Sequence, residues 1–276
     1  MEKVALVRFE DSIKATLQKG LNHIKGIGSK SGPVLIKPNI CTISDGTGHS
    51  VTDIKVVEAV VDIILQEYPD TCIRFVESDS QSKNTMDAFK KFGYLKLRDT
   101  KRESGYDVDA VNLSSKPLVS VKVDGLYYDT VELNEILTQP HYYISVAIAK
   151  THETTFLTAS LKNQFGLLPS KGKASFHSNI SRILVDLNRI VPPDLCIVDG
   201  RVGVEGWNGP KTRPIGVFLL GKNPVSVDAT VMRMMGLDID RVQHLVLASE
   251  NGIGSLHPEV LGEEIASVKV QFKAPF

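Results

Sequence analysis

The sequence predicts an α/β protein in which helices cover both faces of a mainly parallel central sheet. Short apolar runs rich in Val and Ile alternate with longer segments of helical periodicity, an order that is typical of parallel sheets. The chain has 276 residues, of which 42% are hydrophobic, so it can bury a large core. No low-complexity tract or fixed repeat divides it. We therefore expect a single α/β domain over residues 1–276, with an inserted β-hairpin region at about 107–137.

The first half of the chain is expected to contain four strands and three helices. Ser12 and Thr52 each precede an apolar stripe, and a hydroxyl at such a position accepts a hydrogen bond from the first turn of a helix. Gly93 follows a short apolar stripe, as glycine does where a helix ends. The expected strands are residues 4–9, 33–36, 72–76 and 107–113, and the expected helices run from Ser12 to about Gly26, from Thr52 to before Pro69, and from Met86 to Phe92.

Asp124 and Gly125 predict a β-hairpin. They separate two apolar runs, 119–123 and 126–133. An Asp-Gly pair suits the positive φ angles of a two-residue type I′ turn, which joins antiparallel strands. The hairpin therefore interrupts the parallel pattern.

The second half resumes the alternation. Leu157, Leu161 and Phe165 recur at helical spacing, which predicts a helix from about Thr154 to Phe165. A polar, glycine-containing segment after Val198 is expected to be a loop. The expected strands are 142–148, 195–198, 215–220 and 266–272, and the other expected helices are 179–190, 224–235 and 241–250.

Five of the expected strands end in charged or amide side chains. Parallel strands bring their carboxyl ends to one edge of the sheet, and open α/β sheets bind ligands beyond that edge. We therefore expect a polar site there. The segments concerned are Lys37-Pro38-Asn39, Glu77-Ser78-Asp79, Lys150-Thr151-His152, Asp199-Gly200 and Lys222-Asn223.

Lysines at this edge favour an anionic ligand. Pro38 keeps Lys37 extended at a strand end, from which its ammonium can reach an anion. The next loop, residues 41–50, is rich in glycine and small polar residues and leads into a helix. Its amides form a second candidate anion site, with His49 as the titratable member.

The helix expected after His152 would place its first turn beside that imidazole, where a bound anion is favoured. Lys162 and Asn163, later in the same helix, would face away from the sheet. The basic segment at 171–173 and His177 can close over the site as a lid, or can be a surface loop. Trp207 suits stacking on a ligand and anchoring of its own loop equally well.

The acidic side chains near this edge leave several roles open. Asp199, Glu205 and Asp228 are candidate general bases, although Asp228 also lies where a carboxylate stabilises a helix start. With His152 and His177, the first two are donor types that bind nickel, zinc or iron. Their spacing matches no established ligand motif, so the sequence predicts no metal site.

The chain contains, in order, the motifs Lys37-Pro38-Asn39, Ala149-Lys150-Thr151-His152, Leu161-Lys162-Asn163, Phe165-Gly166, His177, Val198-Asp199-Gly200, Glu205-Gly206, Gly209-Pro210, and Asp228 with Gly236-Leu237-Asp238. Together they resemble the family called domain of unknown function 362, from about Pro33 to Gly254. Many members carry ferredoxin-like cysteine clusters, which implies a redox reaction for those members. This sequence has three cysteines without a C-x-x-C pair, so it lacks the iron–sulfur motif.

Composition argues against two classes of partner. The 32 basic and 32 acidic side chains cancel, so no overall field attracts nucleic acid or an anionic membrane. No apolar run approaches the length of a membrane span, and residues 1–8 lack the order of a signal peptide. With its dispersed cysteines, the chain is expected in the cytoplasm.

Two hypotheses remain open. The first is an enzyme that acts on a small anionic substrate or cofactor, with lysines binding the anion and His or Asp transferring protons. The second is a non-catalytic subunit that binds a ligand or a redox protein of a larger iron–sulfur system. An organic cofactor would fit the same edge, by distant analogy with the nickel-cofactor lactate racemases, but the sequence identifies none. The expected catalytic residues are His152, His177 and Asp199, and the expected ligand-binding residues are Lys37, Asn39, His49, Lys150, Thr151, Lys162, Asn163, Glu205 and Asp228.

Overall fold

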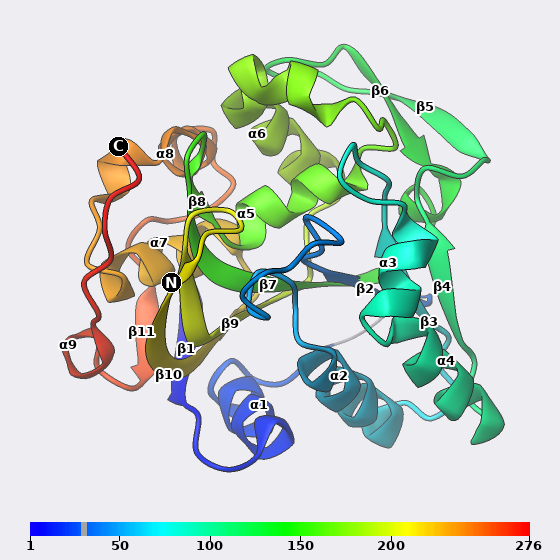
Figure 1. The fold of residues 1–276 in the computed structure, drawn as a ribbon, viewed down its shortest axis with the longest axis horizontal. Coiled ribbons are helices and arrows are strands. Elements are labelled where there is room, and N and C mark those ends of the chain that lie inside the picture. The colour runs from blue at the N-terminus through cyan, green and yellow to red at the C-terminus, as the bar shows by residue number, and fades with distance from the viewer. Residues whose placement is uncertain (29–31) are drawn as a thin grey trace.

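The computed structural model describes residues 1–28 and 32–276. Within this part of the chain, a nine-stranded sheet crosses the molecule and helices cover both of its faces (Figure 1). The strands lie in the order β11-β1-β10-β9-β7-β2-β3-β4, and the short β8 pairs with β7. Their bounds are β1 Lys3–Arg8, β2 Val34–Pro38, β3 Ile73–Glu77, β4 Val108–Asn112, β7 Tyr142–His152, β8 Phe156–Thr158, β9 Leu195–Glu205, β10 Lys211–Gly221 and β11 Glu259–Gly262.

The predicted fold class, α/β with a mainly parallel sheet, is confirmed. Strands β9, β7, β2, β3 and β4 run parallel to one another, whereas β10 is antiparallel to both β9 and β1. Because β10 runs in the opposite direction, its carboxyl end pairs with the start of β9. The expectation that Lys222 and Asn223 join the other strand ends is therefore wrong, since they lie at the opposite edge of the sheet.

Two helical layers enclose the sheet. One face packs against α1 to α4, and the other against α5 to α9 (Figure 1). The α-helices are α1 Ile13–His23, α2 Ile54–Glu67, α3 Thr85–Lys91, α4 Tyr94–Glu103, α5 Ser160–Asn163, α6 Ile180–Ile190, α7 Pro224–Met234, α8 Gln243–Glu250 and α9 Ile265–Val268, with short 3-10 helices at Glu135–Leu137, Gln164–Leu167, Lys173–Asn179 and Ile239–Arg241. No helix among the described residues is both long enough and apolar enough to cross a membrane.

Two helix starts show where local signals succeed and fail. Ser12 caps α1 as predicted, since its hydroxyl accepts from the amide of Ala15 at 3.3 Å. Thr52 does not cap α2, because its hydroxyl donates instead to the carbonyl of Val146 at 2.8 Å. Asp53, one residue later, is the cap and accepts from the amide of Lys55.

The predicted helix at 154–165 is wrong over its first half. The chain reverses after His152 and returns as β8, antiparallel to β7, with Phe156 at a left-handed φ of 65°. The β-branched threonines of this segment favour the extended form. Helix α5 begins only at Ser160, because the distant carboxylate of Asp228 accepts the first two amides of the helix.

Three other segments differ from the sequence prediction. The expected loop after Val198 is extended instead, because β9 continues to Glu205 and pairs with β10 almost to its tip. The expected strand at 266–272 is wrong: this segment starts within α9 and continues without regular structure, and the last strand is β11. Helix α4 was not predicted, because Gly93, at a φ of 87°, redirects the chain into a second helix.

The predicted hairpin exists as β5 Leu118–Lys122 and β6 Thr130–Asn134, antiparallel to each other. Its turn is not the predicted type I′ pair, because the connection is longer and Gly125 lacks a positive φ. The amides of Leu126, Tyr127 and Tyr128 bind the buried carboxylate of Asp186 on α6 at 2.6–3.0 Å. The preceding β4 pairs with β3, so within the interval 107–137 only the hairpin leaves the main sheet.

Substituting Asp186 by asparagine is expected to lower the free energy of unfolding by about 1–3 kcal/mol, because one amide acceptor cannot replace two carboxylate oxygens for three amide donors. Urea unfolding measures this change. Asp129→Asn, an exposed change in the same hairpin, is the control. Equal unfolding midpoints for the two variants would contradict the anchoring role.

The chain leaves two neighbouring central strands in opposite directions. After β2 it enters α2 on one face of the sheet, and after β7 it enters α5 and α6 on the other face. Such divergence opens a crevice beyond the carboxyl ends of the two strands, which is where open α/β sheets bind ligands.

Candidate functional site

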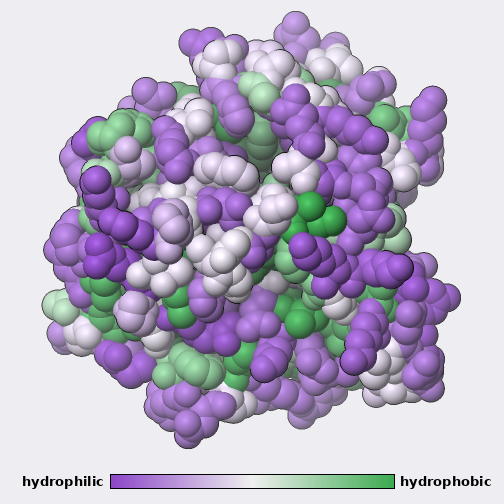
Figure 2. Space-filling model, in the orientation of Figure 1, coloured by the Kyte–Doolittle hydropathy of each residue, from purple (hydrophilic) through white to green (hydrophobic). Residues whose placement is uncertain are grey.

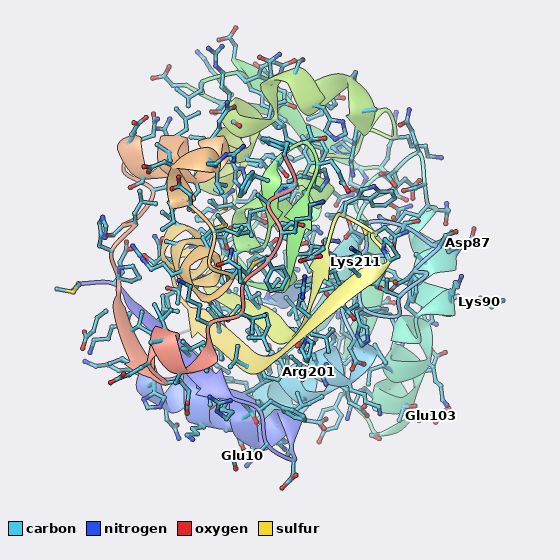
Figure 3. The ribbon with its side chains drawn as sticks, turned by 60° about the vertical axis from the view of Figure 1, so that its left-hand side comes forward. Glu10, Asp87, Lys90, Glu103, Arg201 and Lys211 are labelled. Carbon is cyan, nitrogen blue, oxygen red and sulfur yellow. The ribbon has the colours of Figure 1, made fainter. Side chains whose placement is uncertain are left out.

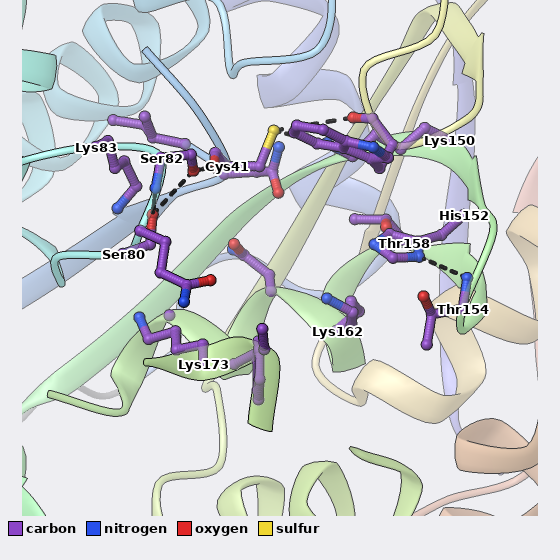
Figure 4. Close-up of a pocket in the computed structure, with 18 of the residues that line it drawn as sticks. Cys41, Ser80, Ser82, Lys83, Lys150, His152, Thr154, Thr158, Lys162 and Lys173 are labelled. Atoms are coloured by element: carbon purple, nitrogen blue, oxygen red, sulfur yellow. Dashed lines mark hydrogen bonds between the residues drawn. The ribbon is translucent and has the colours of Figure 1, made fainter. Parts of the chain in front are cut away.

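A cavity of about 480 Å³ occupies this crevice (Figure 4). Its walls come from the ends of β2, β3 and β7, from α5, from the segment before α6, and from the tip of the β9–β10 hairpin. Seven of the twelve predicted site residues line it. They are Lys37, Asn39, Lys150, His152, Lys162, Asn163 and His177.

The wall of this cavity carries an excess of positive charge. Among the described residues that line it, five are lysines and two are glutamates, so the formal excess with neutral histidines is 5 − 2 = +3. The lysines are Lys37, Lys83, Lys150, Lys162 and Lys173, and the glutamates are Glu77 and Glu153.

Lys37 and Glu77 form a buried ion pair at the floor of the cavity. The Lys37 ammonium lies 2.8 Å from the Glu77 carboxylate, 3.1 Å from the carbonyl of Pro38 and 3.2 Å from the amide oxygen of Asn163. All three ammonium hydrogens of Lys37 therefore have an acceptor. Burial works against ionisation of Glu77, but the nearby lysines outweigh it and lower the pKa of this carboxyl. Lys37 thus holds the floor together and is not open to a ligand.

Lys83, from the turn between β3 and α3, and Lys173, from the segment before α6, lie near the same carboxylate. Lys83 donates to the carbonyl of Ser78 and lies 3.5 Å from Glu77. Lys173 donates to the hydroxyl of Ser78, which is its single acceptor within the described part of the chain. Burial lowers the pKa of Lys173 to about 7, although Glu77 opposes the shift.

Gly166 leaves room for the Lys37–Glu77 pair. A Cβ atom at this position would lie 2.5 Å from the Lys37 nitrogen and 2.5 Å from a Glu77 oxygen. Substituting Gly166 by alanine is therefore expected to separate the pair and lower the free energy of unfolding by about 3 kcal/mol or more. Gly172→Ala is the matched control, because its Cβ would meet only the Ser170 hydroxyl at 4.0 Å. Thermal unfolding of the two variants measures the difference, and similar melting temperatures would contradict the expectation.

Lys150 lies across the cavity from this cluster. Its side chain is buried, and its ammonium donates to the carbonyl of Ser50 at 3.1 Å and lies 3.4 Å from the sulfur of Cys41. These contacts come from the loop after β2, so Lys150 ties that loop to β7.

Lys162 differs from the other four lysines of the cavity. Its ammonium lies 4.8 Å from the centre of the Phe165 ring, and it has no hydrogen-bond acceptor or carboxylate partner among the described residues. Burial and the nearby charge of Lys150 lower the pKa of Lys162 to about 8. The side chain is half-buried and lines the cavity (Figure 4). His177 stacks on the same Phe165 ring, with 6.0 Å between ring centres.

His152 is held in one tautomer. Its Nδ1 atom accepts the amide of Thr154 at 3.0 Å, so the ring proton of the neutral imidazole is on Nε2. Burial and the charges of Lys162 and Lys150 lower the pKa of His152 to about 2. At neutral pH the ring is therefore uncharged, and Nε2–H is its available donor.

Residues 34–233 match the model of a family described as a domain of unknown function (DUF362). The chain belongs to the DUF362 family. The resemblance inferred from the motifs is thereby confirmed. The matched range includes every residue that lines the cavity.

Two proteins similar to this DUF362 chain extend the comparison. The thylakoid-associated protein sll1697 of Synechocystis sp. (strain ATCC 27184 / PCC 6803 / Kazusa) is 24% identical over 260 residues, which are 86% of this chain and 76% of that protein. The lactate racemase apoprotein from Thermoanaerobacterium thermosaccharolyticum is 10% identical, with a TM-score of 0.52 over 77% of this chain. This chain covers 53% of the racemase chain, about half its length, and the likeness shows a shared fold.

Asp199 lies outside the cavity of the DUF362 chain. Its carboxylate accepts from the guanidinium of Arg201 at 2.7 and 3.0 Å, and Arg201 also donates to Asp53 at the start of α2. Neighbouring residues of a strand point to opposite faces. Asp199 points to the α2 side, because its partner Arg201 also donates to Asp53 at the start of α2. The structure therefore does not bring Asp199 to His152 or His177.

Three other expected site residues serve neighbouring elements. The hydroxyl of Thr151 accepts the amide of Gly206 at 2.8 Å and holds the β9–β10 tip against β7. Glu205 pairs with Arg213 on the adjacent strand at 3.0 Å. Asp228 is fully buried and accepts the amides of Ser160 and Leu161, and burial raises its pKa to about 7.

The loop at residues 41–50 binds its own carboxylate. The two oxygens of Asp45 accept three backbone amides of the loop and that of the next residue at 3.0–3.2 Å, so these four amides are not open to an external anion. His49 is exposed and lines a separate hollow with Asn208 and Pro210. The amides belong to Thr47, Gly48, Ser50 and Val51.

Sequence reasoning missed Lys83 and Cys41 as site residues. Lys83 reaches the cavity because the turn after β3 brings it back against Ser80. Its position shortly after a strand end was the signal available. For a metal, no group of three or more His, Cys, Asp or Glu side chains in the described ranges is arranged as a ligand set.

Proposed function

We propose that this DUF362 protein is an enzyme that binds a small anionic molecule in the lysine-lined cavity and transfers a proton to or from it. The excess of lysines over glutamates around one cavity carries this proposal. Burying like charges together is unfavourable unless an anion neutralises them or a lysine loses its proton. A carboxylate or phosphate supplies that neutralisation.

The geometry favours a hydrogen-bonding role for His152 over the proton-transfer role expected from the sequence. A base at this position would become a cation beside Lys150 and Lys162, and the low pKa of His152 reflects that penalty. A fixed Nε2–H donor, in contrast, stabilises an oxyanion without changing its own charge.

Lys162 is the better candidate for proton transfer. A general base works best when its pKa lies near the working pH, and the pKa of Lys162 is lowered to about 8. The protonated form of Lys162 attracts the anion. In the fraction of the complex in which Lys162 is neutral, the amine accepts a proton from a C–H bond next to a carboxylate or carbonyl, and His152 donates to the oxygen on which charge develops. The same ammonium then returns the proton.

The name of the structural neighbour refers to lactate, a small carboxylate. We extend only this class of substrate to the present chain, as part of the proposal. The surface in view favours the cavity over an apolar docking face. Figure 2 shows small separated apolar areas there, and five large hydrophobic side chains of the described residues are exposed. They are Met1, Leu126, Tyr127, Trp207 and Phe276.

The affinity for a small carboxylate is expected to fall as pH rises through about 8. The protonated form of Lys162 attracts the anion, and the bound anion in turn raises the pKa of this lysine. Affinity is therefore full below the pKa of the free site and is lost above it, well before an ordinary lysine would titrate. Calorimetric titration across this pH range measures the effect. Affinity that stays constant until the ordinary lysine range would contradict it.

Hydrogen exchange tests the enzymatic proposal directly. The protein is incubated in D₂O with small carboxylic acids that carry an activated C–H bond, including 2-oxo acids and malonate, and deuterium incorporation is followed by mass spectrometry. We expect incorporation with the wild type and its loss in Lys162→Met. Lys90→Met is the control, because Lys90 is exposed on α3 (Figure 3). Binding without exchange would instead support the non-catalytic ligand-binding alternative.

A further inference from the structure

We propose that the ligand of this cavity carries two anionic groups, one for each end of the cavity. This inference rests on the proposed function, because it concerns the same site. Most of the charged and imidazole side chains of the cavity fall into two groups. The Glu77 cluster consists of Lys37, Lys83 and Lys173 around Glu77, and the His152 cluster consists of Lys150, Lys162 and His152.

The Glu77 cluster contains more buried positive charge than it neutralises. Lys37, Lys83 and Lys173 are 1%, 7% and 9% exposed, and Glu77 is the carboxylate they share. With all three lysines charged, the cluster has a formal charge of 3 − 1 = +2. Lys37 uses all its donors on protein acceptors, but Lys173 donates only to the Ser78 hydroxyl among the described residues. Two donors of Lys173 thus remain for an anion.

The His152 cluster has a separate capacity for an anion. Its members contact no carboxylate in the described part of the chain: Lys150 contacts a carbonyl and a thiol, and Lys162 contacts an aromatic ring. The three donors of Lys162 and the Nε2–H of His152 are all available. An anion that filled the first cluster would leave this one without a partner.

The two clusters lie on opposite sides of the cavity. Figure 4 shows Lys83 and Lys173 on one side and Lys150, His152 and Lys162 on the other. The lining of the cavity also includes Cys41 and the rings of Phe165 and Trp207, which suits a carbon body. A molecule with an anionic group at each end satisfies both clusters, whereas a single carboxylate satisfies one.

The test compares ligands that differ by one anionic group. Calorimetry measures the affinities of succinate, glutarate and adipate against those of butyrate, valerate and hexanoate, which have matching chain lengths. We expect at least one diacid to bind about tenfold or more tightly than its matched monoacid, as a second charge-assisted contact provides. Adding 3-phosphonopropionate distinguishes a site for phosphate-like groups from one for two carboxylates.

Two variants identify the ends. Lys162→Met and Lys173→Met are each expected to weaken the diacid by about tenfold, whereas the monoacid should respond to only one of them. Lys90→Met should change neither affinity. Thermal unfolding confirms that each variant is folded, and the comparison of diacid with monoacid on the wild type stands without them.

The outcomes separate this inference from the proposed function. If monoacids bind the wild type and no diacid or phosphonate binds more tightly, the two-anion inference is overturned and the anion site stands. If a diacid binds more tightly but only one lysine variant weakens it, the assignment of its second group to the other cluster is overturned. If no acid binds, both proposals fail.

Discussion

Replacing Glu77 by glutamine is expected to lower the free energy of unfolding by about 3–5 kcal/mol, one of the largest effects available in this chain. Glu77 is 2% exposed and is the buried carboxylate among three buried lysines. Glutamine keeps the shape and one acceptor oxygen but removes the charge. The lysines then repel one another in a poorly hydrated space, or one of them loses its proton.

The dependence on pH follows from the signs of the two shifts. The pKa of Glu77 is lower in the folded than in the unfolded chain, so its stabilising effect is present above the unfolded value and lost on acidification. The pKa of Lys173 is also lowered, to about 7, so this lysine costs less stability as it loses its proton at higher pH. The destabilisation by Glu77→Gln should therefore be smaller in mildly alkaline than in neutral solution.

Chemical denaturation at two pH values measures both effects. Glu259→Gln is the matched control, because Glu259 pairs with Lys3 at 3.8 Å on the exposed surface, where such a pair contributes about 1 kcal/mol or less. If Glu77→Gln were no more destabilising than Glu259→Gln, the buried cluster would not depend on its carboxylate.

Replacing Lys162 by methionine is expected to weaken carboxylate binding by about tenfold or more while leaving the folded state as stable as the wild type or more so. The ammonium of Lys162 has no protein acceptor within the described residues, so its removal breaks no hydrogen bond. It also relieves repulsion from Lys150. Methionine keeps an unbranched apolar side chain of similar length beside the Phe165 ring.

The opposite signs of these two effects distinguish a ligand-binding lysine from a structural one. Lys150→Met is the informative comparison, because it leaves the carbonyl of Ser50 without its ammonium donor and should lower stability as well as affinity. Calorimetry and thermal unfolding of both variants give the required pair of measurements. A fall in stability for Lys162→Met with unchanged affinity would refute the role proposed for it.

The fold class and much of the site could be predicted from the sequence because both depend on repeated local signals. The parallel strands were predicted from apolar runs. The residues at the carboxyl ends of β2 and β7, such as Lys37 and Lys150, were located from strand topology alone. Lys162 lines the cavity as expected, but the predicted helix that carried it is only partly present. The first half of that helix is the strand β8 and its turn, and α5 begins at Ser160.

The errors came from contacts between residues far apart in the chain. Helix α5 begins where it does because Asp228 accepts its first amides from 68 residues away, which no local pattern encodes. Asp199 and Val198 differ by one position, and only their pairing within the assembled sheet decides which of them points toward α2. The glycine-rich loop did offer converging amides as predicted, but its own Asp45 occupies them.

Gly166 has a consequence for how this site can change over evolutionary time. Because its missing side chain provides the space in which Lys37 meets Glu77, positions 37, 77 and 166 should be substituted together and not one by one. In a lineage that gained a side chain at 166, one member of the pair would first have to be replaced by a shorter or uncharged residue. That replacement would also change the buried charges that surround the other lysines of the cavity. Among relatives that retain Lys37 and Glu77, we therefore expect glycine at this position, and its replacement would mark those in which the cavity has acquired a different chemistry.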